Sequence, residues 1–247
     1  MKIVSLIASY SPANIYLPQV VEELRKVGKV VIFTTEQVDI EVDEIHQYPK
    51  SIGRDLVYKP REWVLNNLDQ EWDYVLYNED DILIPSSSVQ AVIELYNTLP
   101  EDYMPGFIRY EEKVETGDKV YFDMNPLHAV HRRDGYGIVK NVYKEYGVWE
   151  PFNLHSGNWI LSKQDINNMI QHNVFETYYK EYGFQYGNCD QLESAASVPY
   201  MSYTKVFPID IESVECKHLP EKYIHMSELN PTLETLQTLI SNVNSDT

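Results

Sequence analysis

The first 110 residues alternate between short apolar runs and amphipathic segments, a pattern typical of α/β proteins. Residues 2–8 form an apolar run that predicts a buried strand. Residues 18–27 follow with apolar positions at helical spacing, and Pro18 and Gly28 mark the two ends expected of a helix. A β-branched run at 29–35 predicts the next strand. This order indicates a βαβ unit with parallel strands and a right-handed crossover.

The same alternation continues up to residue 110. Residues 36–58 are polar and poorly periodic, so they predict a loop with at most a short edge strand. An amphipathic helix is expected from Pro60 to about Gln70, and an apolar strand at 73–77 follows it. The remaining elements expected in this half are a helix at 86–96 and a strand at 106–110.

After residue 110 the pattern becomes α+β in character. Residues 113–123 predict a hairpin that turns at Thr116-Gly117-Asp118. No internal repeat, low-complexity tract or Gly/Ser linker interrupts the chain, so a single domain is expected. The further elements expected are a strand at 158–162, helices at 163–171, 175–182 and 190–197, a strand at 206–211, and a C-terminal helix beyond Ser227.

Composition and charge narrow the class of protein. The 247 residues carry 38 Asp and Glu against 20 Lys and Arg, a formal charge of −18. Such a protein repels phosphate backbones and anionic headgroups, which disfavours nucleic acid and membrane surfaces as partners. Residues 1–10 lack the pattern of a signal peptide and no apolar run predicts a transmembrane segment, so we expect a cytoplasmic protein. Its two cysteines, Cys189 and Cys216, are expected to be reduced.

Three consecutive acids, Glu79-Asp80-Asp81, are the strongest candidates for chemistry. They stand between the strand expected at 73–77 and the apolar residues 82–84. The carboxyl ends of strands in open α/β sheets form the ligand crevice. Adjacent carboxylates repel each other, and a hard divalent cation with oxygen ligands is the usual way to hold them together. The alternative interpretation is a solvated turn or helix start that tolerates negative charge.

The string EWDYVLYNEDDILIP resembles the strand and acidic loop of GT-A-type nucleotide-sugar glycosyltransferases, whose signature is a D-x-D-like motif. Glu79 stands where that motif has its first Asp. The resemblance implies that Asp81 binds Mn²⁺ or Mg²⁺, while Glu79 or Asp80 contacts the ribose or a metal-bound water. It also implies a GT-A-like mixed central sheet flanked by helices over residues 1–225, with a nucleotide-binding half at 1–110, an acceptor-binding half at 111–225, and a C-terminal helix and tail at 226–247.

The segment GRDLVYKPR places three cations just before the helix that precedes the acidic strand. Arg54, Lys59 and Arg61 are candidates to hold a diphosphate or a nucleobase, unless they are solvated loop charges. The string NLHSGNW resembles the segment that lines the sugar site in many of these enzymes. There Gly157 would allow close approach, and Trp159 would stack on a sugar or fill the core.

The catalytic base and a further metal ligand are expected in the second half. Asp190 and Glu193 are spaced to share a helix face, and the resemblance implies that one of them removes the proton from the acceptor hydroxyl in an inverting reaction. Asp190 is the first choice, with helix capping as the alternative role. The string CKHLP resembles a late segment whose His completes the metal site, which maps to His218, and an imidazole ligand favours Mn²⁺. His225 is the alternative to His218 for this role, and His128 and His131 are weaker candidates.

The function predicted from these features is transfer of a sugar from a UDP- or GDP-sugar, with Mn²⁺ or Mg²⁺, to a hydroxyl of a glycan or another acceptor. Inversion and retention both stay open. A sugar nucleotidyltransferase is an alternative, although residues 9–14 contain no glycine for the usual phosphate loop. A metal-stabilised carbohydrate-binding module without turnover is the non-enzymatic alternative. A metal-dependent hydrolase would call for more histidine and carboxylate spacing motifs.

Overall fold

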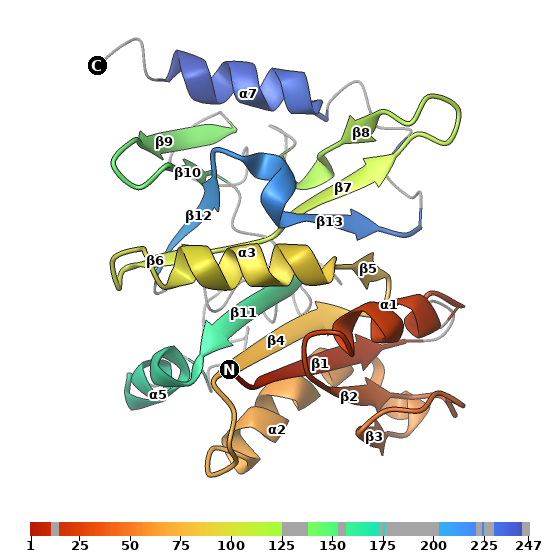
Figure 1. The fold of residues 1–247 in the computed structure, drawn as a ribbon. Coiled ribbons are helices and arrows are strands. Elements are labelled where there is room, and N and C mark those ends of the chain that lie inside the picture. Colours follow the sequence, from red (N-terminus) through yellow and green to blue (C-terminus); the bar gives the residue numbers. More distant parts are fainter. Residues whose placement is uncertain are drawn as a thin grey trace. The chain divides into compact units, whose positions relative to one another are not determined.

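A computed structural model gives a mixed α/β structure with several mixed sheets (Figure 1). The chain divides into two compact units, and each is described by itself. Unit 1 takes residues from both of the predicted halves, whose separate binding roles stay a prediction. Unit 1 comprises 1–86 and 157–202, and unit 2 comprises 87–156 and 203–247. The residues that the structure describes are 1–10, 15–124, 138–152, 157–172, 175, 203–220, 224 and 230–243.

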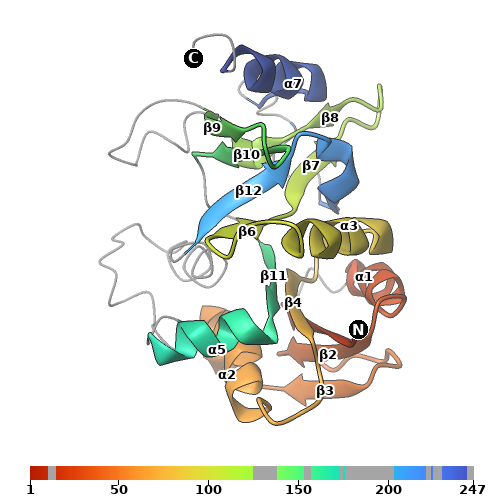
Figure 2. The same ribbon diagram turned by 60° about the vertical axis from the view of Figure 1, so that its left-hand side comes forward.

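Unit 1 is built on a five-stranded sheet with the order β11-β4-β1-β2-β3. Neighbouring strands are parallel, except that β11 runs antiparallel to β4. Figure 2 shows β11 at one edge of this sheet, followed by α5. Its elements are β1 (Ile3–Ser9), α1 (Leu17–Leu24), β2 (Lys29–Thr34), β3 (Glu44–Gln47), the 3₁₀ helix η2 (Lys50–Tyr58), α2 (Lys59–Asn66), β4 (Tyr74–Glu79), β5 (Ile82–Leu83), β11 (Asn158–Ser162) and α5 (Lys163–Gln171).

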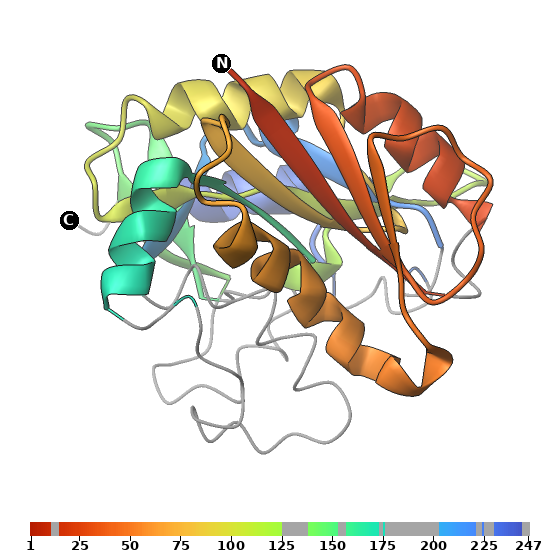
Figure 3. The same cartoon turned by 90° about the horizontal axis from the view of Figure 1, so that it is seen from below.

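The predicted βαβ unit is confirmed by β1, α1 and β2. Every residue of β1 is buried, and α1 buries Leu17, Val20, Val21 and Leu24. Gly28 is required where the chain enters β2, because a Cβ there would lie 2.1 Å from the main-chain oxygen of Ile3. Figure 3 shows α1 and α2 on opposite faces of the sheet. This arrangement follows from right-handed crossovers that run in opposite directions, from β1 to β2 and from β3 to β4.

The prediction for residues 36–58 is confirmed for the edge strand only. β3 forms at that edge, but Lys50–Tyr58 is a 3₁₀ helix rather than a loop. Gly53 lies inside it at a φ of 54°, where two helical pieces meet at a kink. A kinked helix of this kind has no regular apolar spacing, so periodicity does not reveal it.

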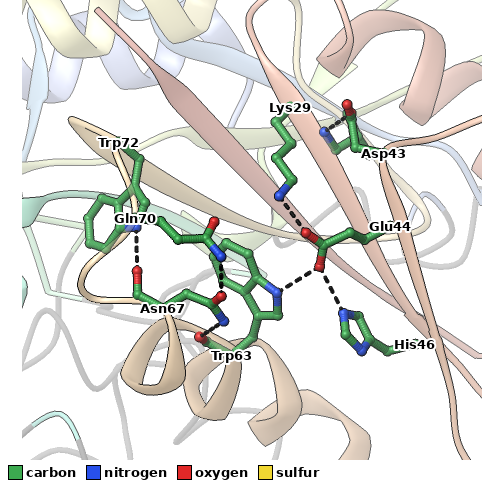
Figure 4. Close-up of polar contacts among 9 residues, drawn as sticks. Lys29, Asp43, Glu44, His46, Trp63, Asn67, Gln70 and Trp72 are labelled. Carbon is green, nitrogen blue, oxygen red and sulfur yellow. Dashed lines mark hydrogen bonds and ion pairs between the residues drawn. The ribbon is translucent and has the colours of Figure 1, made fainter.

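Glu44 ties the edge strand β3 to its neighbours (Figure 4). Its carboxylate accepts hydrogen bonds from Lys29 of β2 and from the indole nitrogen of Trp63 of α2, the latter at 3.0 Å. The His46 ring nitrogen lies 3.1 Å from the same carboxylate, and Lys29 also lies over the Trp63 ring. Burial raises the pKa of Glu44, but these hydrogen bonds outweigh it and leave the pKa below its usual value.

We expect the substitution Glu44→Gln to lower the free energy of unfolding by about 1 to 2 kcal/mol near pH 7, because hydrogen bonds to a charged carboxylate weaken. The lowered pKa makes this contribution present above the unfolded-state value of 4.5, and it is lost as the pH falls through the folded-state pKa. Urea unfolding at pH 7 and pH 3 measures both effects. The exposed Glu41→Gln serves as the control, and an equal loss at both pH values would contradict the role of the charge.

Unit 2 begins within α3 and contains two groups of paired strands. In the first, with the order β6-β12-β10-β9, β6 and β12 are parallel and the other pairs are antiparallel. In the second, β7 pairs in parallel with β13 and antiparallel with β8. Its elements are α3 (Ser86–Tyr96), β6 (Tyr103–Pro105), β7 (Ile108–Glu112), β8 (Lys119–Val120), η3 (Phe122–Met124), β9 (Val139–Tyr143), β10 (Val148–Pro151), β12 (Thr204–Pro208), η6 (Ile211–Val214), β13 (Glu215–His218) and α7 (Leu233–Asn242).

Several predictions for unit 2 are confirmed. The hairpin of β7 and β8 turns at the predicted residues, with Gly117 at a φ of 74°, but its first strand ends at Glu112 and Phe122–Met124 form η3, so the predicted range of 113–123 is shifted. The helix expected at 86–96, the strand expected near 206 and the C-terminal helix correspond to α3, β12 and α7. In unit 1, β11 and α5 match their predicted ranges. Strands β6, β9, β10 and β13 were not predicted, and the helices expected at 175–182 and 190–197 lie outside the described residues except for Phe175.

Candidate functional site

The order of the parallel strands in unit 1 identifies the edge at which a ligand would bind. β1 lies between β2 and β4: the chain leaving β1 crosses to β2, while β4 receives the chain that comes from β3. The connections therefore reverse direction between β1 and β4. In open α/β sheets the ligand crevice lies outside the carboxyl ends of the strands at such a reversal. The residues at this point are Tyr10, after β1, and Glu79, Asp80 and Asp81, at the end of β4; we call the last three the acidic turn.

The chain around the acidic turn is held by buried neighbours. Asn78, fully buried in β4, donates a hydrogen bond from Nδ2 to the main-chain oxygen of Ile82 at 2.7 Å, across the turn. Ile82 is itself fully buried. Two of the three acids between these residues are buried with them, since Asp80 is 3% exposed and Asp81 is 8% exposed. Carboxylates with so little contact with water are costly unless hydrogen bonds or a cation compensate.

Asp80 is directed at the end of β1. Its Oδ2 accepts a hydrogen bond from the main-chain N–H of Tyr10 at 3.0 Å, and its carboxylate is also hydrogen-bonded to the Ser9 side chain. Burial raises the pKa of the Asp80 carboxyl to about 7, and the negative charge of Asp81 adds to this effect. The hydrogen bonds from Ser9 and Tyr10 act in the opposite direction without cancelling it.

Tyr10 connects the acidic turn to η2. Its ring packs against Val57 and Tyr58, and its hydroxyl is hydrogen-bonded to the main chain of Val57. Burial raises the pKa of the Tyr10 hydroxyl well above its usual value, with smaller contributions from Glu79, Asp55 and Asp80. The acidic turn and η2 are therefore close enough to act on the same side chain.

Arg61 brings a positive charge to this part of unit 1. It is a buried residue of α2, with its guanidinium 5.2 Å from the centre of the Tyr58 ring. Its charge also acts on the buried Tyr77 of β4, where Glu79 and Asp80 act with the opposite sign. One of the three predicted cations and two acids of the acidic turn thus act on the same β4 side chain, Tyr77. Tyr10 and Asn78 were not predicted as site residues, although the position of Tyr10 directly after the first strand was a usable signal.

The other residues predicted to bind the nucleotide-sugar have surroundings that differ from those of Arg61. Lys59 is paired with Glu62 at 2.6 Å and lies over the Tyr48 ring. Arg54 belongs to η2, but its side chain lies outside the described part of the structure. Trp159 is fully buried, with its ring stacked 5.5 Å from that of Tyr77, so it fills the core and has no exposed face for a sugar. Gly157 precedes β11 and is buried. The binding role of Gly157 stays a prediction.

His218 lies in unit 2, where it forms a buried pair with Glu111. Its Nδ1 is 2.6 Å from Glu111 Oε1, and its ring packs against Phe122 at 5.3 Å. A carboxylate in this position orients an imidazole, as it does for metal-binding histidines. Glu111 was not singled out in the sequence. The remaining candidates, Asp190, Glu193, His225, His128 and His131, lie outside the described residues.

The fit of a divalent cation is decided by the donor atoms of the acidic turn. Within the described part of the chain, no three His, Cys, Asp or Glu side chains come together as a metal site. Mg²⁺, however, is usually held by one or two carboxylates, with substrate phosphates and water supplying the other oxygens. Glu79 and Asp81 suit such a partial set.

None of the described helices has the length and apolar character needed to cross a membrane.

Comparison with known proteins adds no relative: no family model matches the chain, and none of the curated proteins matches it.

The raised pKa of Asp80 predicts an unusual dependence of stability on pH. The carboxyl has a pKa of about 7 in the folded protein and 3.8 as its reference value, so the folded state binds the extra proton between these values. Stability therefore falls as the pH rises through this window, with a slope of at most about 1.4 kcal/mol per pH unit. Asp80→Asn should remove this slope in urea unfolding curves recorded from pH 4 to pH 8. Parallel pH profiles of the variant and wild type would contradict the prediction.

Proposed function

We propose that this protein is a metal-dependent glycosyltransferase of the GT-A type, which moves a sugar from a nucleoside-diphosphate donor to a hydroxyl acceptor. The observation that carries the proposal is the acidic turn, which lies at the reversal point between the parallel strands β1 and β4. A crevice at this position is where α/β sheets bind nucleotides. The resemblance of the string EWDYVLYNEDDILIP to the acidic loop of GT-A enzymes supports the same assignment.

Charge explains why an acidic protein would bind an anionic donor at this point. Glu79 and Asp81 are hard oxygen donors of the kind that Mn²⁺ and Mg²⁺ accept, and these ions also bind diphosphate oxygens. The bound cation would stabilise the negative charge that develops on the leaving nucleoside diphosphate. Arg61 provides a fixed positive charge in the same unit. Glu79, the last residue of β4, would contact the ribose or a metal-bound water.

An inverting transfer needs one proton acceptor from the protein. The acceptor hydroxyl oxygen forms a bond to the anomeric carbon while the bond from that carbon to the diphosphate oxygen breaks. The hydroxyl proton passes to a carboxylate, for which Asp190 is the first candidate and Glu193 the second. His218, which is paired with Glu111 in unit 2, is the histidine that the resemblance to GT-A enzymes proposes as a cation ligand.

Thermal unfolding tests this proposal directly. The purified protein is heated with each of a set of UDP-, GDP-, dTDP- and CMP-sugars, with and without Mn²⁺. One nucleotide together with the metal should raise the unfolding temperature, since a ligand at one hundred times its Kd adds about 2.7 kcal/mol to stability. Asp81→Asn should abolish the shift, whereas Asp69→Asn, which changes an exposed acid of the same unit, should keep it.

Two other results would favour different functions. Stabilisation by a glycan and a cation, with no response to any nucleotide, would favour a carbohydrate-binding module. Stabilisation by a nucleoside triphosphate together with a sugar phosphate would favour a nucleotidyltransferase. Release of nucleoside diphosphate from the stabilising donor, dependent on an added acceptor, would then establish the transfer reaction.

A further inference from the structure

The three acids of the acidic turn have different surroundings. Asp80 is buried, and its carboxylate bonds to the Tyr10 main-chain N–H and to the Ser9 side chain. Glu79 is more exposed and completes β4 in register with Ala8 of β1. Asp81 is next to Ile82, where the chain leaves the turn. Asp80 is therefore a carboxylate of this acidic motif whose hydrogen bonds go to the end of the neighbouring strand β1.

Tyr10 extends this connection to a third segment. Its main chain bonds to Asp80, while its ring packs against Val57 and Tyr58 and its hydroxyl bonds to the Val57 main chain. Val57 and Tyr58 end η2, and α2 with Arg61 follows immediately. The contacts from Asp80 through Tyr10 to Val57 thus join the end of β4, the end of β1 and the end of η2. The helix α2, which carries Arg61, begins directly after η2.

We propose that Asp80 and Tyr10 are positioning residues, which set the distance between the acidic turn and the junction of η2 with α2, where Arg61 lies. Asp80 itself binds neither cation nor nucleotide. This inference rests on the proposed function and divides the work within its acidic motif: Glu79 and Asp81 contact the ligand, and Asp80 holds them in place. A cation that took Asp80 as a ligand would compete with the Tyr10 N–H. The part-buried Tyr10 N–H would then be left without its acceptor, which is unfavourable.

The opposite end of the same two strands provides a matched control. Asp73, just before β4, accepts a hydrogen bond from the main-chain N–H of Lys2, just before β1, at 2.6 Å. Asp73 and Asp80 therefore make the same kind of contact between the same strands, one at the amino ends and one at the carboxyl ends. Only the second contact lies at the acidic turn. Removal of Asp73 tests the effect of losing such a bond without disturbing the site.

The test measures the affinity for Mn²⁺ alone, from the electron paramagnetic resonance signal of the free ion, in wild type and in variants of the whole chain. Asp80→Asn keeps an oxygen acceptor for Tyr10, so its Kd should stay within about threefold of wild type. Asp81→Asn should raise the Kd by more than about tenfold, which is about 1.4 kcal/mol. Asp80→Ala should also weaken binding by about tenfold or more, although Asp73→Ala should not.

Four results would overturn the inference. An equal loss of affinity in Asp80→Asn and Asp80→Ala would make Asp80 a ligand. Unchanged affinity in Asp80→Ala, with only a lower unfolding temperature, would make its role purely structural. Fast exchange of the Tyr10 amide hydrogen in wild type would show that the hydrogen bond to Asp80 does not form. Equal protection of this amide in Asp80→Ala and in wild type would show that Asp80 is not its acceptor.

The amide measurement separates this inference from the proposed function. If wild type binds no Mn²⁺, the proposed function loses its support. The Asp80–Tyr10 contact is then still tested by amide exchange, since Tyr10 should be protected in wild type and Asp80→Asn and unprotected in Asp80→Ala. A Tyr10→Phe variant, which removes only the hydroxyl bond to Val57, shows whether η2 takes part.

Discussion

Parallel pairing of β1 with both β2 and β4 is the constraint on which the candidate site depends. A central strand with parallel neighbours brings three carboxyl ends to one edge, and the connections must leave that edge in opposite directions. The acidic turn stands there because it directly continues β4. Gly28 supports this pairing at the amino ends of the strands, since it lies so close to Ile3 just before β2 that no side chain fits there.

Three acids that are adjacent in the sequence differ in their burial, because Asp80 and Asp81 are buried and Glu79 is more exposed. Asn78 and the buried Ile82 draw the turn inward, and Asp80 is compensated by the main chain that leaves β1. The same low exposure that raises its pKa makes its hydrogen bonds strong and their loss costly. In this protein, whose net charge is −18, hydrogen bonds can therefore compensate a buried carboxylate such as Asp80 in place of a cation.

Much of unit 1 was predictable because its elements have strong local signals. Buried strands such as β1 are continuous apolar runs, and α1 has a proline at its start and a glycine beyond its end. The short strands of unit 2 were missed, since β9 is largely polar and β6 has only three residues. For the site, the acidic turn was correctly placed at a strand end. The contacts of Asp80 with Tyr10, and of His218 with Glu111, join residues 70 and 107 positions apart, which no spacing rule connects.

The charges around β3 have a consequence for the behaviour of the protein at high concentration. An edge strand presents unpaired main-chain groups to which the same strand of another molecule can add. Here the edge carries a carboxylate, an imidazole and a nearby ammonium group, from Glu44, His46 and Lys29. Bringing two such edges together would remove these charged and polar groups from water. The polar cluster that fastens β3 to its own sheet therefore also protects the molecule against sheet-to-sheet association.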